Sequence, residues 1–141
     1  MPQRLSDLES GANMVVQAAD VQDPSVEYFA VVSNPYSSFR RFMAQAMSEN
    51  RIPGMVELMA HGTVRFSETD ACYVSVFDML RGGRLYREGE APLEESIVLD
   101  LVLPTVATCL LNLHKSGLTH RGIRADNLFF ADENRTELLL V

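Results

Sequence analysis

The 141-residue chain is poor in cysteine and in positive charge, and both shortages exclude classes of protein. Its two cysteines, Cys72 and Cys109, lie far apart and form no CxxC pair. We therefore expect buried, inert thiols in a reducing compartment rather than a disulfide scaffold or a zinc module. Twelve Lys and Arg residues against nineteen Asp and Glu residues give a formal net charge of −7. That sign opposes the phosphate neutralisation that dominates nucleic-acid affinity, so we expect neither nucleic acid nor a membrane as partner.

Long hydrophobic runs are also missing. Residues 1–10 carry acidic and polar groups, which does not support a secretory signal. The most apolar stretch, residues 101–113, is interrupted by proline and polar residues and is shorter than the roughly 20 residues that span a bilayer. With 47% hydrophobic and 22% charged residues, the composition predicts a globular protein with one core, and we expect it in the cytoplasm.

Strand-like runs open the sequence, and an amphipathic helix follows them. The strands are expected at residues 5–10, 13–19 and 27–33. Ser37 or Ser38 can cap the helix. Its apolar residues recur at helical spacing along one face, and they are Phe39, Phe42, Met43, Ala46 and Met47.

The remainder predicts further strands and one long helix. In chain order the segments are strands at residues 55–59, 62–66 and 72–77, a helix at residues 93–115, and strands at residues 127–130 and 137–141. The sequence His61-Gly62 separates the first two strands, and Pro104 predicts a kink in the helix because proline lacks a backbone donor. This order of elements describes an α+β fold.

One segment resembles a known family. Residues 113–128, LHKSGLTHRGIRADNL, resemble the catalytic loop of protein kinases, L-H-x-x-x-(I/L)-x-H-R-D-L-K-P-x-N-L, which also follows a long helix. Upstream segments agree in order: Ala30 lies in a strand similar to V-A-x-K, residues 53–58 resemble the H-P-N-I-V-x-L strand, and residues 77–83 resemble the hinge between the lobes.

The resemblance implies a protein kinase-like α+β fold. Residues 1–80 would form the N-terminal lobe, a five-stranded antiparallel sheet with one helix. Residues 81–141 would form the hinge, the long helix and the catalytic-loop hairpin of an incomplete C-terminal lobe. About half of a kinase-like domain is covered, so we expect either a piece of a longer chain or a long helix whose apolar surface is covered by another copy or a partner.

The matched catalytic loop lacks its proton acceptor. The family's loop aspartate is matched by Gly122, which has no side chain. Arg124 matches the loop lysine and keeps a positive charge with a different geometry. Asn127 matches the asparagine that holds a second magnesium ion, but a lone amide binds Mg²⁺ poorly. The resemblance gives His120 and Arg121 structural roles, so no catalytic residue is expected to be intact.

An aspartate in this loop and three histidines are further candidates for chemistry. Asp126 is the nearest alternative base, although its matching position in the family faces elsewhere. The histidines His61, His114 and His120 lack compact spacing with cysteines or acids, so we expect no metal site.

The phosphate-anchoring residues are also missing. In the family a lysine lies two residues beyond the strand alanine, where this chain has Val32. Its glutamate partner is matched by Met43, and because Lys115 is the only lysine, no shift of the alignment restores the pair. Loss of both charges together avoids a buried, unpaired charge. Gly11 is at best one of the three glycines of the phosphate loop, and an ordinary hairpin turn explains it equally well.

The resemblance leaves an apolar cleft. The residues matching adenine-contacting positions are Val16, Ala30, Phe77, Asp78, Leu80 and Phe129. Apolar residues on strands are more often ordinary core, and the two phenylalanines can fill the adenine space themselves. A vestigial or filled pocket is therefore as good a reading as a working nucleotide site.

We therefore expect a pseudokinase-like protein-interaction or scaffolding module, with a protein partner or self-association and no cofactor. Two alternatives stay open. One is an atypical kinase-fold enzyme with Arg124 and Asn127 on the phosphates, and the other is a sensor that binds ATP and magnesium in the degenerate cleft. Residues 81–87 hold three arginines that could bind an anionic partner, or that simply form a solvated loop.

Overall fold

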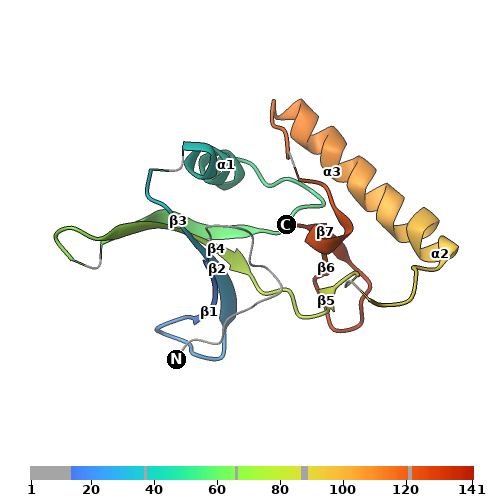
Figure 1. Ribbon diagram of the computed structural model, residues 1–141, viewed down its shortest axis with the longest axis horizontal. Coiled ribbons are helices and arrows are strands. Elements are labelled where there is room, and N and C mark those ends of the chain that lie inside the picture. The colour runs from blue at the N-terminus through green and yellow to red at the C-terminus, as the bar shows by residue number, and fades with distance from the viewer. Residues whose placement is uncertain (1–13, 37, 66, 87–88, 121) are drawn as a thin grey trace. The chain divides into compact units, whose positions relative to one another are not determined.

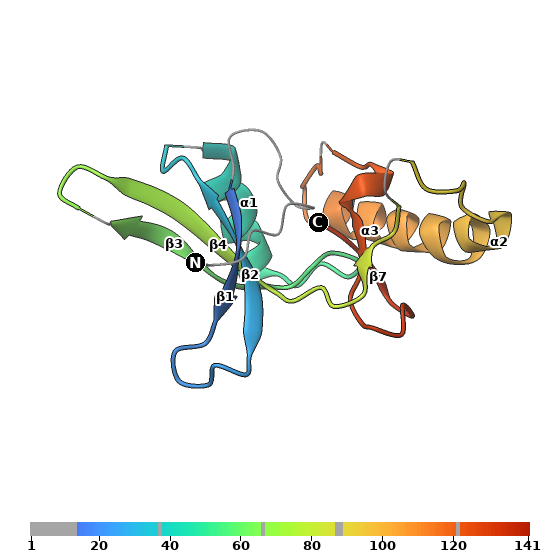
Figure 2. The ribbon, with the colours of Figure 1, turned by 60° about the horizontal axis from the view of Figure 1, so that its bottom comes forward.

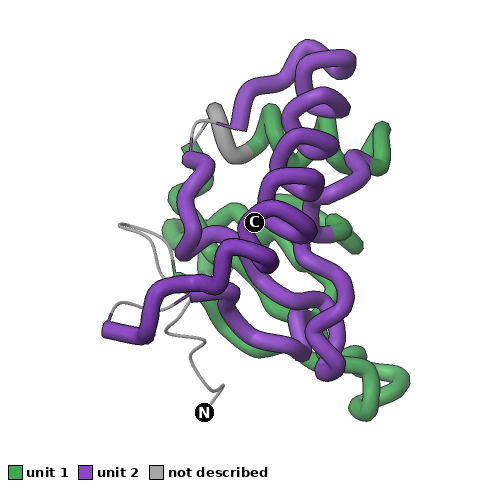
Figure 3. Tube along the Cα trace, turned by 90° about the vertical axis from the view of Figure 1, so that its right-hand side faces the viewer, with its two compact units in different colours: residues 1–51, 57–79 green, residues 52–56, 80–141 purple. Residues whose placement is uncertain are grey.

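The structure is a computed structural model that describes residues 14–36, 38–65, 67–86, 89–120 and 122–141 (Figure 1). The chain forms two compact units, coloured separately in Figure 3. Unit 1 holds the described residues up to Arg51 together with Glu57–Met79. Unit 2 holds Ile52–Val56 and Leu80–Val141, so a short segment within the first 80 residues packs with the second unit.

Unit 1 is built on a four-stranded antiparallel sheet. Its strands are β1 (Met14–Ala19), β2 (Glu27–Ser33), β3 (Leu58–Arg65) and β4 (Ala71–Asp78), arranged in the order β1-β2-β4-β3 (Figures 1 and 2). The expected hairpin of β1 and β2 is confirmed. The fifth strand expected at residues 5–10 lies outside the described residues.

The expected break at His61-Gly62 is wrong. β3 continues through both residues, which pair with Ser75 and Val74 of β4. The irregularity in this pair of strands falls earlier, between Leu58 and Ala60. Cross-strand pairing of seven β3 residues overrides the turn preference of a single glycine, because β-sheet formation depends on tertiary context more than on local propensity.

Helix α1 (Ser38–Glu49) contacts β3 on one face of this sheet. Arg41 identifies that face, because its guanidinium donates to Thr63 Oγ1 at 2.9 Å and lies 5.5 Å from the centre of the Tyr73 ring. The predicted apolar face is partly wrong. Phe42 is 60% exposed, whereas Ala44 is buried. Successive helical residues are about 100° apart, so turning the small Ala44 toward the sheet directs Phe42 away from it.

Unit 2 contains a small three-stranded sheet. Its strands are β5 (Gly83–Arg84), β6 (Leu128–Phe130) and β7 (Leu138–Leu140), in the order β5-β6-β7. The hairpin expected near the end of the sequence is confirmed by the pairing of β6 with β7. Met55 bridges to Leu140 in parallel, which ties the segment Ile52–Val56 to this sheet.

The long helix runs from Glu95 to Lys115 as α2 (Glu95–Ile97), a π-helical turn (Val98–Val102) and α3 (Leu103–Lys115). The π-helical turn ends two residues before Pro104, the residue for which a kink is expected. Such a turn changes the hydrogen-bond ladder of the helix. Gly117, with φ 70°, follows the end of the helix, and Leu118 N–H donates to Leu113 O at 2.9 Å. That geometry is the expected glycine-terminated helix end.

This helix is one segment of the described chain that is long and apolar enough to cross a membrane, judged by length and composition alone. At 21 residues it exceeds the stretch of residues 101–113 on which the sequence-based expectation rested. Only 11% of its most apolar part is buried.

Both cysteines are free and buried, as expected. Burial raises the pKa of the Cys109 thiol to about 11. Since the thiolate is the reactive form of cysteine, Cys109 is inert near neutral pH.

Candidate functional site

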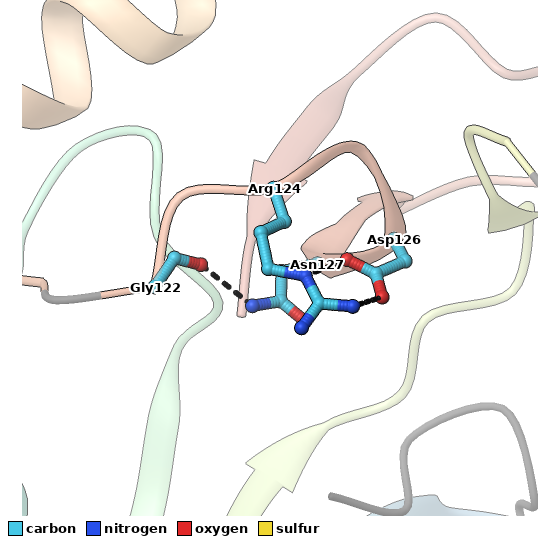
Figure 4. Close-up of polar contacts among 4 residues, drawn as sticks. All are labelled: Gly122, Arg124, Asp126 and Asn127. Carbon is cyan, nitrogen blue, oxygen red and sulfur yellow. Dashed lines mark hydrogen bonds and ion pairs between the residues drawn. The ribbon is translucent and has the colours of Figure 1, made fainter.

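The loop whose sequence resembles the kinase catalytic loop lies in unit 2 between α3 and β6. Its last residues form a 3₁₀ turn, Ala125–Asn127, directly before β6. Figure 4 shows how four of its residues meet: Gly122, Arg124, Asp126 and Asn127. Arg121, for which the resemblance implies a structural role, lies outside the described residues.

Arg124 is paired within the loop. Its Nε donates to Asp126 Oδ1 at 2.9 Å, and its Nη2 contacts Oδ2 of the same carboxylate (Figure 4). Such two-point pairing is the strong geometry for a guanidinium and a carboxylate. The cation that matches the family's lysine therefore has an internal counter-ion, and Asp126, the alternative base, is engaged by that cation.

Asn127 is also engaged by the loop itself. Its side-chain Nδ2 donates to Gly122 O at 2.6 Å (Figure 4), and its backbone carbonyl accepts from Val141 N–H at 2.9 Å. The side-chain amide of Asn127 thus links the end of the loop to Gly122 in its middle. The backbone carbonyl links the loop to Val141, the residue that follows β7. These contacts give Asn127 a structural task that requires no metal ion.

Gly122 matches the position of the catalytic aspartate in the kinase motif, and no steric constraint requires a glycine there. A Cβ added there would meet Asn127 Nδ2 at 3.6 Å and His120 Nδ1 at 3.9 Å, both ordinary van der Waals distances. Its φ is not among the positive values found at other glycines. A Cβ at this position therefore meets no steric obstacle.

His120 connects the loop with the end of β7. Its Nδ1 accepts a hydrogen bond from Gly122 N–H at 3.2 Å, and the ring also hydrogen-bonds the backbone of Val141. Burial lowers the pKa of His120 below its ordinary value, and the Val141 contact only partly opposes that shift. The neutral imidazole is the form that accepts the Gly122 bond, so burial and the Gly122 hydrogen bond favour the same protonation state.

The expected adenine-contacting residues of unit 1 do not share one face of its sheet. Val16 and Ala30 are direct cross-strand partners in β1 and β2, and Ala30 pairs in turn with Val76. Phe77 pairs with Phe29, with ring centroids 5.0 Å apart. Because successive strand residues point to opposite faces, Phe77 lies on the other face from Val16 and Ala30. Exposed Asp78 uses its Oδ1 to accept from the Met79 backbone at 2.9 Å.

The same register separates the two positions matched to the family's ion pair. Thr63 and Tyr73, which contact α1, share a sheet face with Ser33. Val32 therefore points away from the face that α1 covers, whereas Met43 belongs to α1. The family's lysine and glutamate meet, so this arrangement departs from the family geometry.

In unit 2, Phe129 is buried in β6 and Leu80 is half-buried. The guanidinium of Arg84 lies 5.4 Å from the Phe129 ring centroid, a cation–π distance. The buried Nε of Arg84 has no hydrogen-bond partner among the described residues. The sequence indicates only that this arginine belongs to a surface run, because its place over a β6 ring depends on the β5–β6 pairing.

Some candidates cannot be placed. Gly11 and Arg87 lie outside the described residues. Within the described ranges, no group of three or more His, Cys, Asp or Glu side chains is positioned to hold a metal ion.

Comparisons with known proteins add no family to these observations. No protein-family model matches the chain, and a search of curated proteins finds no match either. The plain description of the fold is therefore a mixed α+β chain with a four-stranded antiparallel sheet, a second small sheet and a long helix.

Proposed function

We propose that this chain is a pseudokinase-like interaction module that carries out no phosphoryl transfer. The observation that carries the proposal is the set of hydrogen bonds and the ion pair that the loop residues form with one another. Arg124 is held by Asp126, the Asn127 amide by the Gly122 carbonyl, and His120 by Gly122 and Val141. The Arg124 guanidinium, which is 70% exposed, and the Asn127 amide N–H group thus both have partners within the loop in the absence of a phosphate or a metal.

The positions of Val32 and Met43 support the same proposal. A phosphate-anchoring lysine at position 32 would point away from α1. A glutamate on that helix would therefore not form an ion pair with it. Substituting charges at these two positions would leave each of them without its partner, which is costly where the side chain is shielded from water.

A transfer assay tests the proposal. We expect no label to pass from [γ-³²P]ATP to the chain or to a generic protein substrate in the presence of Mg²⁺. Transfer that disappears in Arg124→Ala would instead establish the atypical enzyme, in which Arg124 and Asn127 hold the phosphates.

The variant Gly122→Asp sharpens this assay. A Cβ added at Gly122 makes only ordinary van der Waals contacts, so we expect the variant to fold, with an unfolding midpoint close to that of the parent. It should still transfer no label, because a base without anchored phosphates does not position the reacting atoms. Label transfer by Gly122→Asp would show that the base is the sole defect, and would contradict the proposal that the loop serves a structural purpose.

A further inference from the structure

Arg84 of β5 lies on one face of the small sheet of unit 2, beside two apolar side chains. It is the direct cross-strand partner of Phe129 in β6, and Phe129 is in turn the partner of Leu139 in β7. Direct partners in an antiparallel sheet point to the same face, so the three side chains form one row across the sheet. We call Arg84, Phe129 and Leu139 the arginine row.

The arginine row is partly open to solvent. The residues of β6 and β7 that point to the opposite face are all buried, and they are Leu128, Phe130, Leu138 and Leu140. In the row itself Phe129 is buried, whereas Arg84 and Leu139 on either side of it are half-buried. A molecule that arrives from solvent therefore meets a cation at one end of the row and an aliphatic side chain at the other.

The guanidinium of Arg84 has no counter-ion among the described residues. It lies 5.4 Å from the centre of the Phe129 ring, and its Nε is shielded from solvent without a hydrogen-bond partner. No ion pair joins it to a described carboxylate, whereas Arg51 and Arg124 each pair with one. Opposite charges attract more strongly where water is partly excluded. Arg84 therefore gains more from an incoming anion than the two paired arginines do.

The composition of the row favours a carboxylate carried on an apolar body. A guanidinium presents a planar set of N–H donors that matches the two oxygens of a carboxylate. Phe129 and Leu139 supply apolar surface beside that charge, which a small inorganic anion would leave without a partner. Arginine and aromatic residues are also enriched among the side chains that dominate binding at protein interfaces.

We propose that Arg84 binds a carboxylate whose apolar body packs against Leu139 and the edge of Phe129. The inference names the chemistry of the partner that the proposed interaction module recognises, and it rests on that function only in this respect. An acidic side chain of a polypeptide and a free organic acid both supply a carboxylate, and the contact with Arg84 is the same for both.

Titration of the isotope-labelled 141-residue chain with phenylacetate, followed by NMR, tests this inference. We expect saturable shifts of the Arg84 Nε–H signal and of the Phe129 backbone amide signal. Phenylacetamide has the same ring without the charge, and it should bind at least tenfold more weakly. This comparison uses the parent chain and requires no variant to fold. Equal binding of the acid and the amide, or no saturable shift with the acid, would overturn the inference.

Two arginine variants assign the binding to one side chain. Arg84→Gln should weaken phenylacetate binding at least tenfold, since it removes the charge. Arg81→Gln is the matched control, because Arg81 is exposed in the same run of arginines. Its backbone N–H donates to Ala131 O at 3.0 Å, a bond that the substitution leaves in place. The control should bind like the parent, and equal losses in the two variants would overturn the assignment to Arg84.

Two further probes distinguish the sources of the carboxylate. The capped dipeptide acetyl-glutamyl-phenylalanine amide carries the carboxylate on a polypeptide, and inorganic phosphate carries charge without an apolar body. We expect the dipeptide to bind at least as tightly as phenylacetate, and phosphate to bind at least tenfold more weakly. A dipeptide that does not bind would overturn recognition of an acidic polypeptide. Phosphate that binds as tightly as phenylacetate would overturn the part assigned to Leu139 and Phe129.

None of these probes is a nucleotide. A chain that binds no carboxylate would refute the Arg84 contact and leave the inactive loop untouched. Label transfer from ATP would refute the inactive loop and leave the Arg84 contact untouched.

Discussion

Single residues of the loop between α3 and β6 hydrogen-bond one another or the neighbouring backbone. Asn127 and His120, which the motif could supply to a reaction, hydrogen-bond the backbone of Gly122 and Val141 instead. The motif in the sequence singles out these two residues, but it does not predict the groups to which they hydrogen-bond. The pairing of Arg124 with Asp126 depends on the 3₁₀ turn of Ala125–Asn127, and no spacing rule for helices or strands predicts it.

The protonation of His120 makes the stability of the loop depend on pH. The pKa of His120 is lower in the folded chain than the ordinary 6.5, so the unfolded chain binds the proton first as the pH falls. The contribution of His120 to stability is complete above about pH 6.5 and decreases as the pH falls below that value.

We therefore expect the thermal unfolding midpoint to decrease when the pH is lowered from 7.5 to 5.5. The variant His120→Gln should lose part of that dependence, since glutamine does not titrate. Thermal unfolding of both chains, followed by circular dichroism, measures the difference. An identical pH dependence in the two chains would show that His120 does not cause the pH dependence of stability.

At the scale of elements, the sequence predicts what local patterns determine. The β1–β2 hairpin, α1 and the long helix follow from alternation, helical spacing and the glycine after the helix end. The continuity of β3 through Gly62 and the exposure of Phe42 do not follow. Both depend on how an element meets its neighbour, which the one-dimensional pattern does not contain.

Two glycines differ in how closely neighbouring atoms approach them, and they provide a matched pair of variants. A Cβ at Gly82 would collide with the Asp132 carbonyl and the Phe130 Cβ, where the chain entering β5 passes the β6–β7 turn. At Gly62 in β3, no described atom lies within 4 Å of an added Cβ. We expect Gly82→Ala to cost about 1–3 kcal/mol or more of unfolding free energy.

Gly62→Ala should change stability little or raise it by about 0.4–1 kcal/mol, because alanine restricts the unfolded chain. Denaturant unfolding of the two variants checks both values. Equal destabilisation by the two substitutions would contradict the close approach at Gly82.

At the scale of the whole molecule, the α+β class follows from the order of elements in the sequence, and the structure bears it out. The sequence also locates the loop that could carry chemistry. It does not show that the loop is occupied by its own contacts, or that Phe77 and Ala30 lie on opposite faces of one sheet. Those features arise from strand register, and a shift of one residue in register exchanges the two faces.

The central proposal is that the loop of this chain that resembles the kinase catalytic loop supports no nucleotide chemistry. Mg·ATP binding tests the claim most directly, through the unfolding midpoint of the full chain with and without a large excess of Mg·ATP. A ligand present at 100 times its Kd would stabilise the folded chain by about 2.7 kcal/mol, a shift of several degrees. The account predicts no shift, and a magnesium-dependent rise of that size, lost in Arg124→Ala, would contradict it.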